Sequence, residues 1–229
     1  MFTGDALEKT QSGEAWIGAA PPHGALPIAN MLCWPSFNLY FRPFIGATAD
    51  VVKYTPGLRY VLLLGSCSVS GNAMAAAVKS GFAVGMSPDG IAGIFNANSS
   101  EELVALKNRK GLAKLMLRTG TALIPAYSMG NSKAFGVWHD PWGIMEAMSR
   151  KLKVSIFVPY GRWGLPIPFR VNLTLLFAAP IRVQKVAEGT EPTTKQIDEL
   201  HQRILDDMTD LFNTHKGSLG LQRQTLKFV

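Results

Sequence analysis

The chain has few cysteines, few charged residues and no long apolar run. Two cysteines among 229 residues exclude a disulfide framework, so we expect Cys33 and Cys67 to be reduced core residues in a reducing compartment. No apolar segment reaches the ~18 residues of a membrane-spanning helix, and the N-terminus shows no secretory signal. The length fits one domain with a full core.

Common motifs for metals, nucleotides and nucleic acids are also missing. The four histidines are scattered and no C-x-x-C pair occurs, so no metal site is expected. The sequence has neither a phosphate loop nor a G-x-G-x-x-G turn. It shows no helix-turn-helix, zinc-finger or RNP pattern, so nucleic acid is not an expected partner.

Acidic residues are absent from two long stretches. The net charge is +7, from 23 basic and 16 acidic residues, although charged residues make up only 17% of the chain. Residues 103–139 include six basic side chains and residues 147–187 include seven, with no acid in either stretch. An apolar, basic surface suits a phosphate-bearing substrate or an anionic membrane face.

The most informative stretch is an apolar run at residues 16–20, followed by Pro21, Pro22, His23 and Gly24. The run is typical of a buried parallel strand, and the two prolines end it. His23 is therefore expected on a turn at the carboxyl end of a strand, where α/β folds bind ligands. A base beside a glycine N–H can serve acyl transfer, but an isolated His-Gly pair is more often an ordinary turn.

A second strand end offers a carboxylate. Residues 82–86 form another apolar run, and Ser87-Pro88-Asp89-Gly90 is the turn after it. A catalytic histidine usually needs an acidic or carbonyl partner, and no acid occurs from residue 15 to residue 49. A carboxylate partner for His23 must therefore come from a distant loop, and Asp89 is the nearest candidate.

The hydrophobic pattern alternates strands with helices and predicts an α/β fold. Strands are expected at residues 16–20, 82–86, 122–127, 154–158 and 171–178, and helices at 70–79, 112–119 and 193–215. Residues 60–64 fit a strand or a buried helix, and Ser99-x-x-Glu102 fits a capping box. His201 and His215 are expected on the surface of the last helix. The aromatic segment 31–44 fits either core or a lipid-facing patch.

Four segments in order resemble the type 2 diacylglycerol acyltransferase family, which includes monoacylglycerol and wax-alcohol acyltransferases. They are P-P-H-G at residues 21–24, R-K-G-L-A-K-L-M-L-R-T-G-T-A-L-I-P-A-Y-S-M-G at 109–130, G-R-W-G-L-P-I-P-F-R at 161–170 and the helix at 200–216. The resemblance implies a mixed, mostly parallel central sheet flanked by helices, as in glycerolipid acyltransferases, in one domain over residues 1–229.

Three departures from the family pattern stand out. Only 22 residues precede His23, so the family's N-terminal membrane helices are expected to be absent. The family's G-G-x-x-E motif after the second strand begins here with Asp89 and ends on Gly93 in place of the glutamate. The first histidine of the H-P-H-G form is Pro21, a change that other members of the family tolerate.

The resemblance implies transfer of a fatty acyl group from acyl-CoA to diacylglycerol, making triacylglycerol, with His23 as general base and no covalent intermediate. No cofactor is implied, since acyl-CoA is a co-substrate. Asp89 replaces the family glutamate, and a backbone N–H near Gly24 or the cation of Arg162 stabilises the oxyanion.

Substrate binding is assigned to Pro22, within the histidine motif, and to four basic residues. Arg109, Lys110 and Lys114 are expected to hold the phosphates of coenzyme A, with a solvated basic face as the equal alternative, and Arg162 lies in the third matching segment.

Two further hypotheses stay open: a weak or silent paralogue that binds lipid or membrane, and an acyltransferase for monoacylglycerol, a fatty alcohol or a lysophospholipid. The expected partners are acyl-CoA, a neutral lipid and a membrane surface, and a homo-oligomer is also left open. The expected location is the cytoplasmic face of the endoplasmic reticulum membrane or the surface of lipid droplets.

Overall fold

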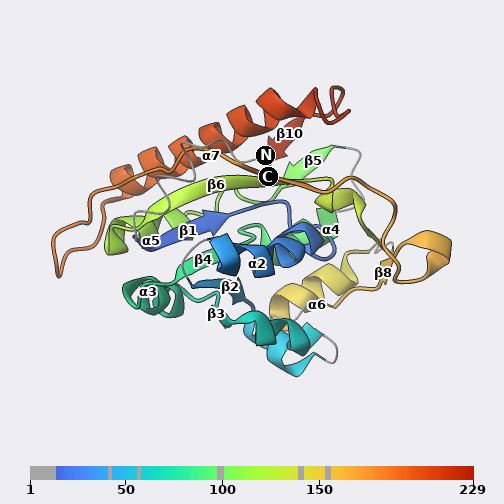
Figure 1. The fold of residues 1–229 in the computed structure, drawn as a ribbon, viewed down its shortest axis with the longest axis horizontal. Coiled ribbons are helices and arrows are strands. Elements are labelled where there is room, and N and C mark those ends of the chain that lie inside the picture. The colour runs from blue at the N-terminus through green and yellow to red at the C-terminus, as the bar shows by residue number, and fades with distance from the viewer. Residues whose placement is uncertain (1–13, 41–42, 56–57, 97–100, 139–141, 153–155) are drawn as a thin grey trace.

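The computed structural model describes residues 14–40, 43–55, 58–96, 101–138, 142–152 and 156–229. It confirms a mixed α/β fold with a largely parallel central sheet of six strands, in the order β3-β2-β4-β1-β6-β9 (Figure 1). Only the edge strand β9 runs antiparallel to its neighbour. The strands are β1 (Trp16–Ala19), β2 (Phe44–Thr48), β3 (Ser66–Ser68), β4 (Ala83–Met86), β6 (Ala122–Met129) and β9 (Thr174–Phe177).

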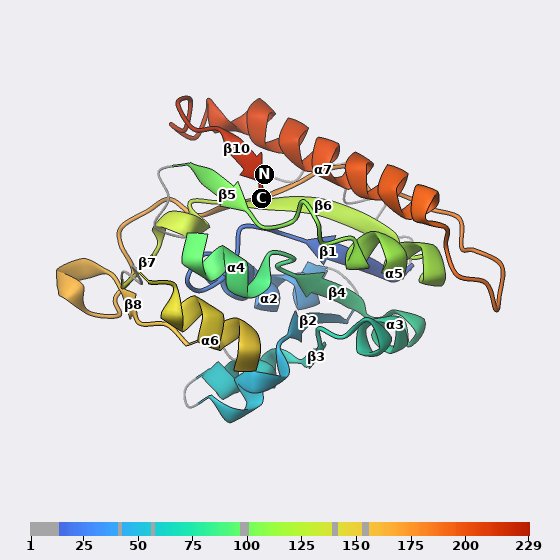
Figure 2. The ribbon, with the colours of Figure 1, turned by 180° about the vertical axis from the view of Figure 1, so that it is seen from behind.

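Helices cover both faces of this sheet. The main core lies between one sheet face and three helices, α3 (Gly71–Lys79), α5 (Gly111–Thr119) and α7 (Thr194–Lys216) (Figures 1 and 2). The opposite face packs against α2 (Ile28–Tyr40) in a second, mainly aromatic cluster. Successive strand residues point to opposite faces, so β1, β2, β4, β6 and β9 each contribute to both clusters.

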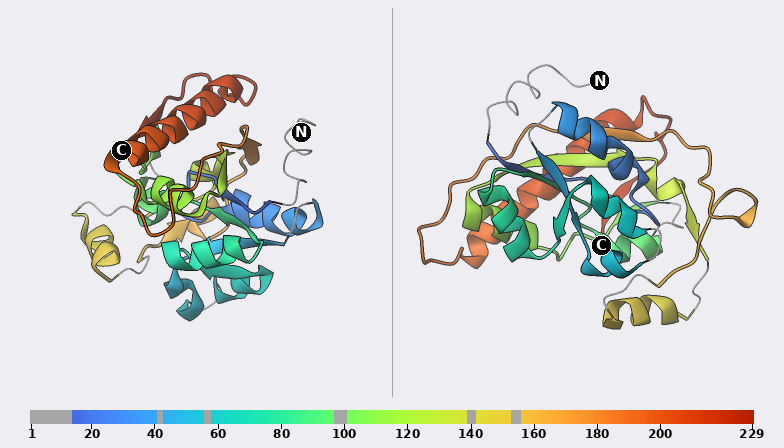
Figure 3. Two further views of the ribbon diagram at one scale, coloured as in Figure 1. Left: turned by 90° about the vertical axis from the view of Figure 1, so that its left-hand side faces the viewer. Right: turned by 60° about the horizontal axis from the view of Figure 1, so that its bottom comes forward.

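Shorter elements surround the two layers. Figure 3 shows α6 (Ile144–Leu152) set apart from the central sheet. The remaining elements are α4 (Gly90–Phe95), the parallel pair β5 (Glu102–Val104) and β10 (Leu226–Phe228), the antiparallel pair β7 (Gly136–Val137) and β8 (Pro159–Tyr160), and the 3₁₀ turns η1 (Asp50–Tyr54), η2 (Leu58–Leu64), η4 (Asn131–Lys133) and η5 (Arg162–Gly164).

Local signals in the sequence account for the helix ends. The Ser70 hydroxyl accepts a hydrogen bond from the N–H of Ala73 and so begins α3. Thr193 and Gln196 form the capping box that begins α7. Gly120 ends α5 in the left-handed conformation, with φ of 71°. These three predicted helices are confirmed.

Some predictions of local structure are wrong. Residues 60–64 belong to an exposed 3₁₀ segment, in which the side chain of Leu63 is 82% exposed. Glu102 does not open a helix: it begins β5 and is buried, while Ser99 lies outside the described residues. His201 is buried, with its Nε2 atom 3.0 Å from the carbonyl oxygen of Lys107. Long-range packing decided the positions of Glu102 and His201.

The later strands also differ from expectation. Residues 153–155 lie outside the described residues, residues 156–158 are not a strand, and β8 begins at Pro159. The last sheet strand is shorter than predicted, at Thr174–Phe177. Strand β2 was not predicted, because its residues lie at the end of the aromatic segment and contain little alternation.

Three aromatic residues of the segment 31–44 are core, whereas the side chains of residues 39–42 lie outside the described ones. Trp34, Phe37 and Phe44 are each 6% exposed, whereas Leu32 on the same helix is 67% exposed. Among the described residues, no helix is long and apolar enough to cross a membrane. Both cysteines are free and half-buried, and burial raises the pKa of their thiols.

Candidate active site

Three neighbouring parallel strands end at the same edge of the sheet, and each is followed by a polar residue. Ala19 of β1 pairs with Met86 of β4 on one side and with Pro125 of β6 on the other. The chain then leads to His23 after β1, to Asp89 after β4 and to Asn131 after β6. The parallel register therefore brings together side chains that lie far apart in the sequence.

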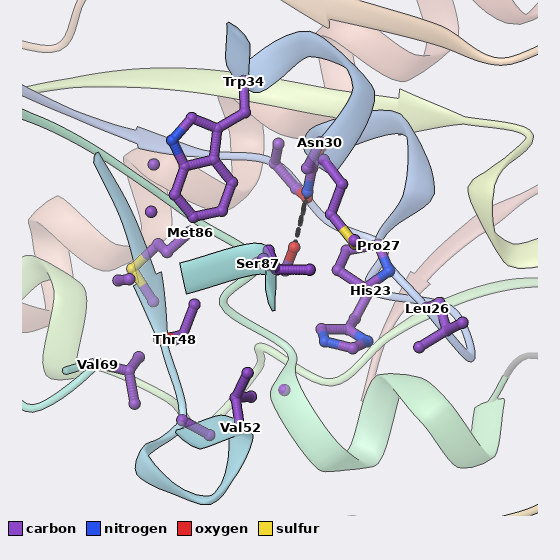
Figure 4. Close-up of a pocket in the computed structure, with 18 of the residues that line it drawn as sticks. His23, Leu26, Pro27, Asn30, Trp34, Thr48, Val52, Val69, Met86 and Ser87 are labelled. Carbon is purple, nitrogen blue, oxygen red and sulfur yellow. Dashed lines mark hydrogen bonds between the residues drawn. The ribbon is translucent and has the colours of Figure 1, made fainter. Parts of the chain in front are cut away.

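The hydrogen bond of the His23 ring fixes which nitrogen can act as a base. Its Nδ1 atom lies 2.9 Å from the carbonyl oxygen of Gly24. A carbonyl oxygen only accepts hydrogen bonds, so in the neutral ring Nδ1 carries the proton and Nε2 keeps its lone pair. The half-buried ring also lines the large cavity described below (Figure 4). In its neutral form, His23 therefore offers Nε2 as the proton acceptor there.

Asp89 contacts the main chain of His23. Its Oδ2 atom accepts a hydrogen bond of 2.8 Å from the backbone N–H of His23, and the residue is fully buried. Its Oδ1 atom is buried without a hydrogen-bond partner in the described part of the chain. Burial raises the pKa of the Asp89 carboxyl, and the nearby His23 and Arg109 partly oppose that rise. Asp89 thus anchors the turn through the main chain, while the carbonyl of Gly24 orients the ring.

Asn131 holds the same turn from the other side. Its Nδ2 group lies 3.0 Å from the carbonyl oxygen of Pro22, 2.6 Å from that of His23 and 3.2 Å from that of Leu26. Its Oδ1 atom accepts a hydrogen bond of 3.1 Å from the N–H of Ala29. The fully buried Asn131 therefore fixes the path of the chain from the end of β1 to the start of α2.

A buried carboxylate, Glu102, supports the segment that carries Asn131. Glu102 accepts hydrogen bonds from Ser132, at 2.9 and 3.2 Å, and from the Tyr127 hydroxyl at 3.3 Å. Burial and the neighbouring Glu102 carboxylate raise the pKa of Tyr127 well above its usual range. Because Ser132 follows Asn131 directly, this network holds the 3₁₀ turn that contains Asn131.

Replacing Asn131 with alanine should lower both stability and turnover. The variant leaves buried carbonyl groups without donors, so we expect the free energy of unfolding to fall by about 1–3 kcal/mol. Since Asn131 fixes the turn but does not line the cavity, kcat should fall while KM for the substrates changes little. Denaturant unfolding and steady-state kinetics measure both effects. An unchanged kcat in a destabilised variant would mean that Asn131 serves the fold alone.

Gly93 lies where Asp89 and His23 meet. A Cβ atom at position 93 would come within 2.0 Å of Oδ2 of Asp89 and 3.1 Å of Cβ of His23. Real Cβ contacts are never this short, so the Asp89 carboxylate occupies the space that a side chain at position 93 would need. A glutamate at position 93, as in the family motif, therefore cannot be accommodated beside Asp89 without rearrangement.

A large apolar cavity opens beside His23. It has a volume of about 270 Å³ and lies between α2 and the sheet. Figure 4 shows His23, Leu26 and Pro27 at one side of it and Trp34 and Met86 at the other. Small-molecule sites in proteins are typically such apolar cavities with a few placed polar groups.

The basic residues assigned to coenzyme A are divided between two faces. Lys110 forms an ion pair with Asp198 at 2.7 Å, and Lys114 forms one with Glu191 at 2.9 Å, both toward the α7 side. Arg109 lines a second cavity of about 210 Å³, whose walls share Val69 and Met86 with the first. A Cβ on Gly90 would come within 3.2 Å of Nη1 of Arg109, so this guanidinium lies beside the Asp89 turn.

The structure also places the remaining assigned residues. Pro22 is buried in the histidine turn, where its carbonyl oxygen accepts from Asn131. Arg162 donates to the carbonyl oxygen of Pro168 at 3.1 Å and lies over the ring of Trp163. It does not line the cavity at His23. Asn131 was missed, although it follows β6 by the strand-end rule that singled out His23 and Asp89.

Comparison with known proteins identifies the family of this chain. The family model described as diacylglycerol acyltransferase matches residues 7–229. The chain is 29% identical to diacylglycerol O-acyltransferase 2-like protein 6 of Bos taurus, over 90% of this chain and 67% of that protein. It is 32% identical to 2-acylglycerol O-acyltransferase 1 of Mus musculus, over 55% of this chain and 40% of that protein. It is 28% identical to diacylglycerol O-acyltransferase 2 of Mus musculus, over 79% of this chain and 49% of that protein.

Proposed function

Because the chain belongs to the diacylglycerol acyltransferase family, we propose that it transfers a fatty acyl group from acyl-CoA to a lipid hydroxyl, with diacylglycerol as the acceptor. The observation that carries this proposal is the ring of His23, whose Nδ1 lies against the Gly24 carbonyl, beside an apolar cavity large enough to hold part of a hydrocarbon chain. The Asp89 carboxylate beneath the turn, in the space of the missing family glutamate, favours an active enzyme over a silent paralogue.

The proposed reaction needs one base and no covalent enzyme intermediate. Nε2 of His23 takes the proton of the acceptor hydroxyl while its oxygen attacks the thioester carbonyl carbon. The new C–O bond forms, the C–S bond breaks, and the proton passes from Nε2 to the departing thiolate. The N–H of Gly24 has no acceptor in the described part of the chain and is the proposed oxyanion donor.

Arg109 is the proposed contact for the phosphates of coenzyme A. It lies beside the second cavity, which joins the walls of the first, and an arginine can bind a phosphate through two N–H groups. Lys110 and Lys114 are already paired with acids at the α7 side, so they contribute less to this binding. Of the three basic residues predicted to bind the phosphates of coenzyme A, we therefore retain Arg109 as the main contact.

Product analysis with labelled acyl-CoA and a panel of acceptors tests the function. We expect triacylglycerol from diacylglycerol to be the main product, with monoacylglycerol, a fatty alcohol and a lysophospholipid as competing acceptors. In the same assay, Arg109→Ala should raise KM for acyl-CoA, whereas Lys114→Ala, which only breaks the exposed pair with Glu191, should not. Absence of acyl transfer to every acceptor would contradict the proposal.

Peripheral binding to a membrane surface is the proposed setting of the reaction. Two arginines lie over exposed aromatic rings, Arg59 over Tyr60 and Arg162 over Trp163, a combination suited to an anionic interface. The cytoplasmic face of the endoplasmic reticulum or the surface of lipid droplets is the proposed location. Flotation with anionic vesicles should decrease as the salt concentration rises, and no flotation at low salt would contradict this setting.

A further inference from the structure

Three glycines form a row across the sheet face that floors the cavity. Gly85 of β4 pairs in register with Gly46 of β2 on one side and with Gly18 of β1 on the other. All three line the cavity. Neighbouring strands lie about 4.8 Å apart, so the row crosses three strands without a single side chain.

Aromatic rings lie directly on this row. A Cβ on Gly46 would come within 2.0 Å of Cη2 of Trp34, and a Cβ on Gly85 within 2.3 Å of Cζ of Phe44. The rings of Trp34 and Phe44 are 6.3 Å apart between centroids, edge to face. The absence of side chains on the glycines therefore lets the rings pack directly against the backbone and against each other. We call Trp34 and Phe44 together the aromatic wall.

The aromatic wall stands across the cavity from the base. Figure 4 shows Trp34 on the opposite side of the cavity from His23. The indole Nε1 of Trp34 is buried without a hydrogen-bond partner in the described part of the chain. Packing alone therefore holds this ring, and a smaller apolar residue at position 34 would extend the cavity without removing a hydrogen bond.

We propose that the aromatic wall limits the length of the alkyl chain that the cavity accepts when the reacting carbonyl or hydroxyl lies at His23, and that Trp34 is the specificity-determining residue. This inference rests on the proposed function, because the cavity must hold a chain of the acyl donor or of the lipid acceptor. A chain that is too long meets rings that are locked on the glycine row. A shorter chain leaves part of the apolar cavity empty.

Chain-length series on the full protein test the proposal. One series varies the saturated acyl-CoA donor from medium to very long chains at a fixed acceptor, and another varies the chains of the acceptor at a fixed donor. For Trp34→Ala and the milder Trp34→Phe, we expect the ratio of kcat/KM for long over short chains to rise by about tenfold or more in one series, because a methylene that does or does not fit changes kcat/KM by that order. The series that responds identifies which chain occupies the cavity.

Gly46→Ala should shift the ratio the other way, since the added Cβ must push Trp34 into the cavity. Phe212→Leu is the matched control: this buried aromatic residue packs on Tyr127 in the main core, so its loss should lower stability without changing the ratio. An unchanged ratio in both series for every variant at position 34 would overturn the proposal while leaving acyl transfer in place. Loss of transfer by the wild-type protein itself would instead refute the proposed function.

Discussion

Replacing His23 with alanine should lower kcat by about 10²–10⁴-fold, the usual cost of removing a general base. The proton acceptor is Nε2, because Nδ1 is engaged by the carbonyl oxygen of Gly24. The fold should survive, since Asp89 and Asn131 bind backbone atoms of residue 23 that alanine retains. Acyl transfer from labelled acyl-CoA, measured beside thermal unfolding, separates the two effects.

His215 offers a matched control for this variant. Its Nδ1 also lies 2.9 Å from a main-chain carbonyl oxygen, that of Leu211, but it belongs to α7 and does not line the cavity. His215→Gln should therefore leave turnover unchanged. A His23→Ala protein that is folded and keeps near-normal turnover would exclude His23 as the base.

The second large effect concerns the position of the site carboxylate. It is at Asp89 in this chain, four residues before position 93, where the family has a glutamate. Gly93→Glu alone should abolish most activity, because its Cβ must displace the Asp89 carboxylate and bring a second buried carboxylate beside it. Asp89→Gly alone should also reduce activity, since the N–H of His23 loses its acceptor. The double variant Asp89→Gly/Gly93→Glu frees the space and restores the family's arrangement, so we expect it to be more active than either single variant.

The four proteins form a double-mutant cycle. Residues in contact typically show coupling of 0.5–3 kcal/mol, which corresponds to about 2–150-fold in kcat/KM. Gly217→Glu provides a control, because a Cβ there meets no atom within 4 Å. If the double variant is no better than the product of the single effects, the two positions do not share one carboxylate site.

The same geometry predicts the effect of Asp89→Asn. In a serine protease, the acid-to-amide change in the triad costs about 10⁴-fold because it fixes the wrong tautomer. Here the tautomer is fixed by the Gly24 carbonyl, and an asparagine oxygen can still accept from the N–H of His23. Only the negative charge is lost, so we expect a much smaller effect on kcat. Because burial raises the pKa of Asp89, its charged form disfavours folding near neutral pH, and the amide should not lower thermal stability.

The sequence by itself determined the features that depend on local chemistry. Pro21 and Pro22 end β1 because they cannot continue its hydrogen-bond ladder, which leaves His23 on a strand-end turn. Ser70 and Thr193 begin their helices through bonds to nearby N–H groups, and Gly120 ends α5 because it tolerates a positive φ. The alternation of strands and helices was sufficient for the α/β class.

Only the tertiary structure decided which atoms meet at the site. The sequence placed Asp89 near His23, but only the parallel register of β1 and β4 shows that the carboxylate binds the backbone N–H, while Gly24 orients the ring. Asn131 reaches this turn from more than 100 residues away. Such contacts depend on strand order and side-chain direction, which nearest neighbours in the sequence do not specify.

The tertiary structure also decided which aromatic side chains are buried. Trp34 fitted either core or a lipid-facing surface, and the choice depends on Gly46, in a strand that the sequence pattern did not reveal. Because Gly46 has no Cβ, the indole ring of Trp34 has space to pack on the sheet. Hydrophobicity determined that these aromatic side chains would leave water, whereas the pairing of three glycines on three strands determined where they would pack.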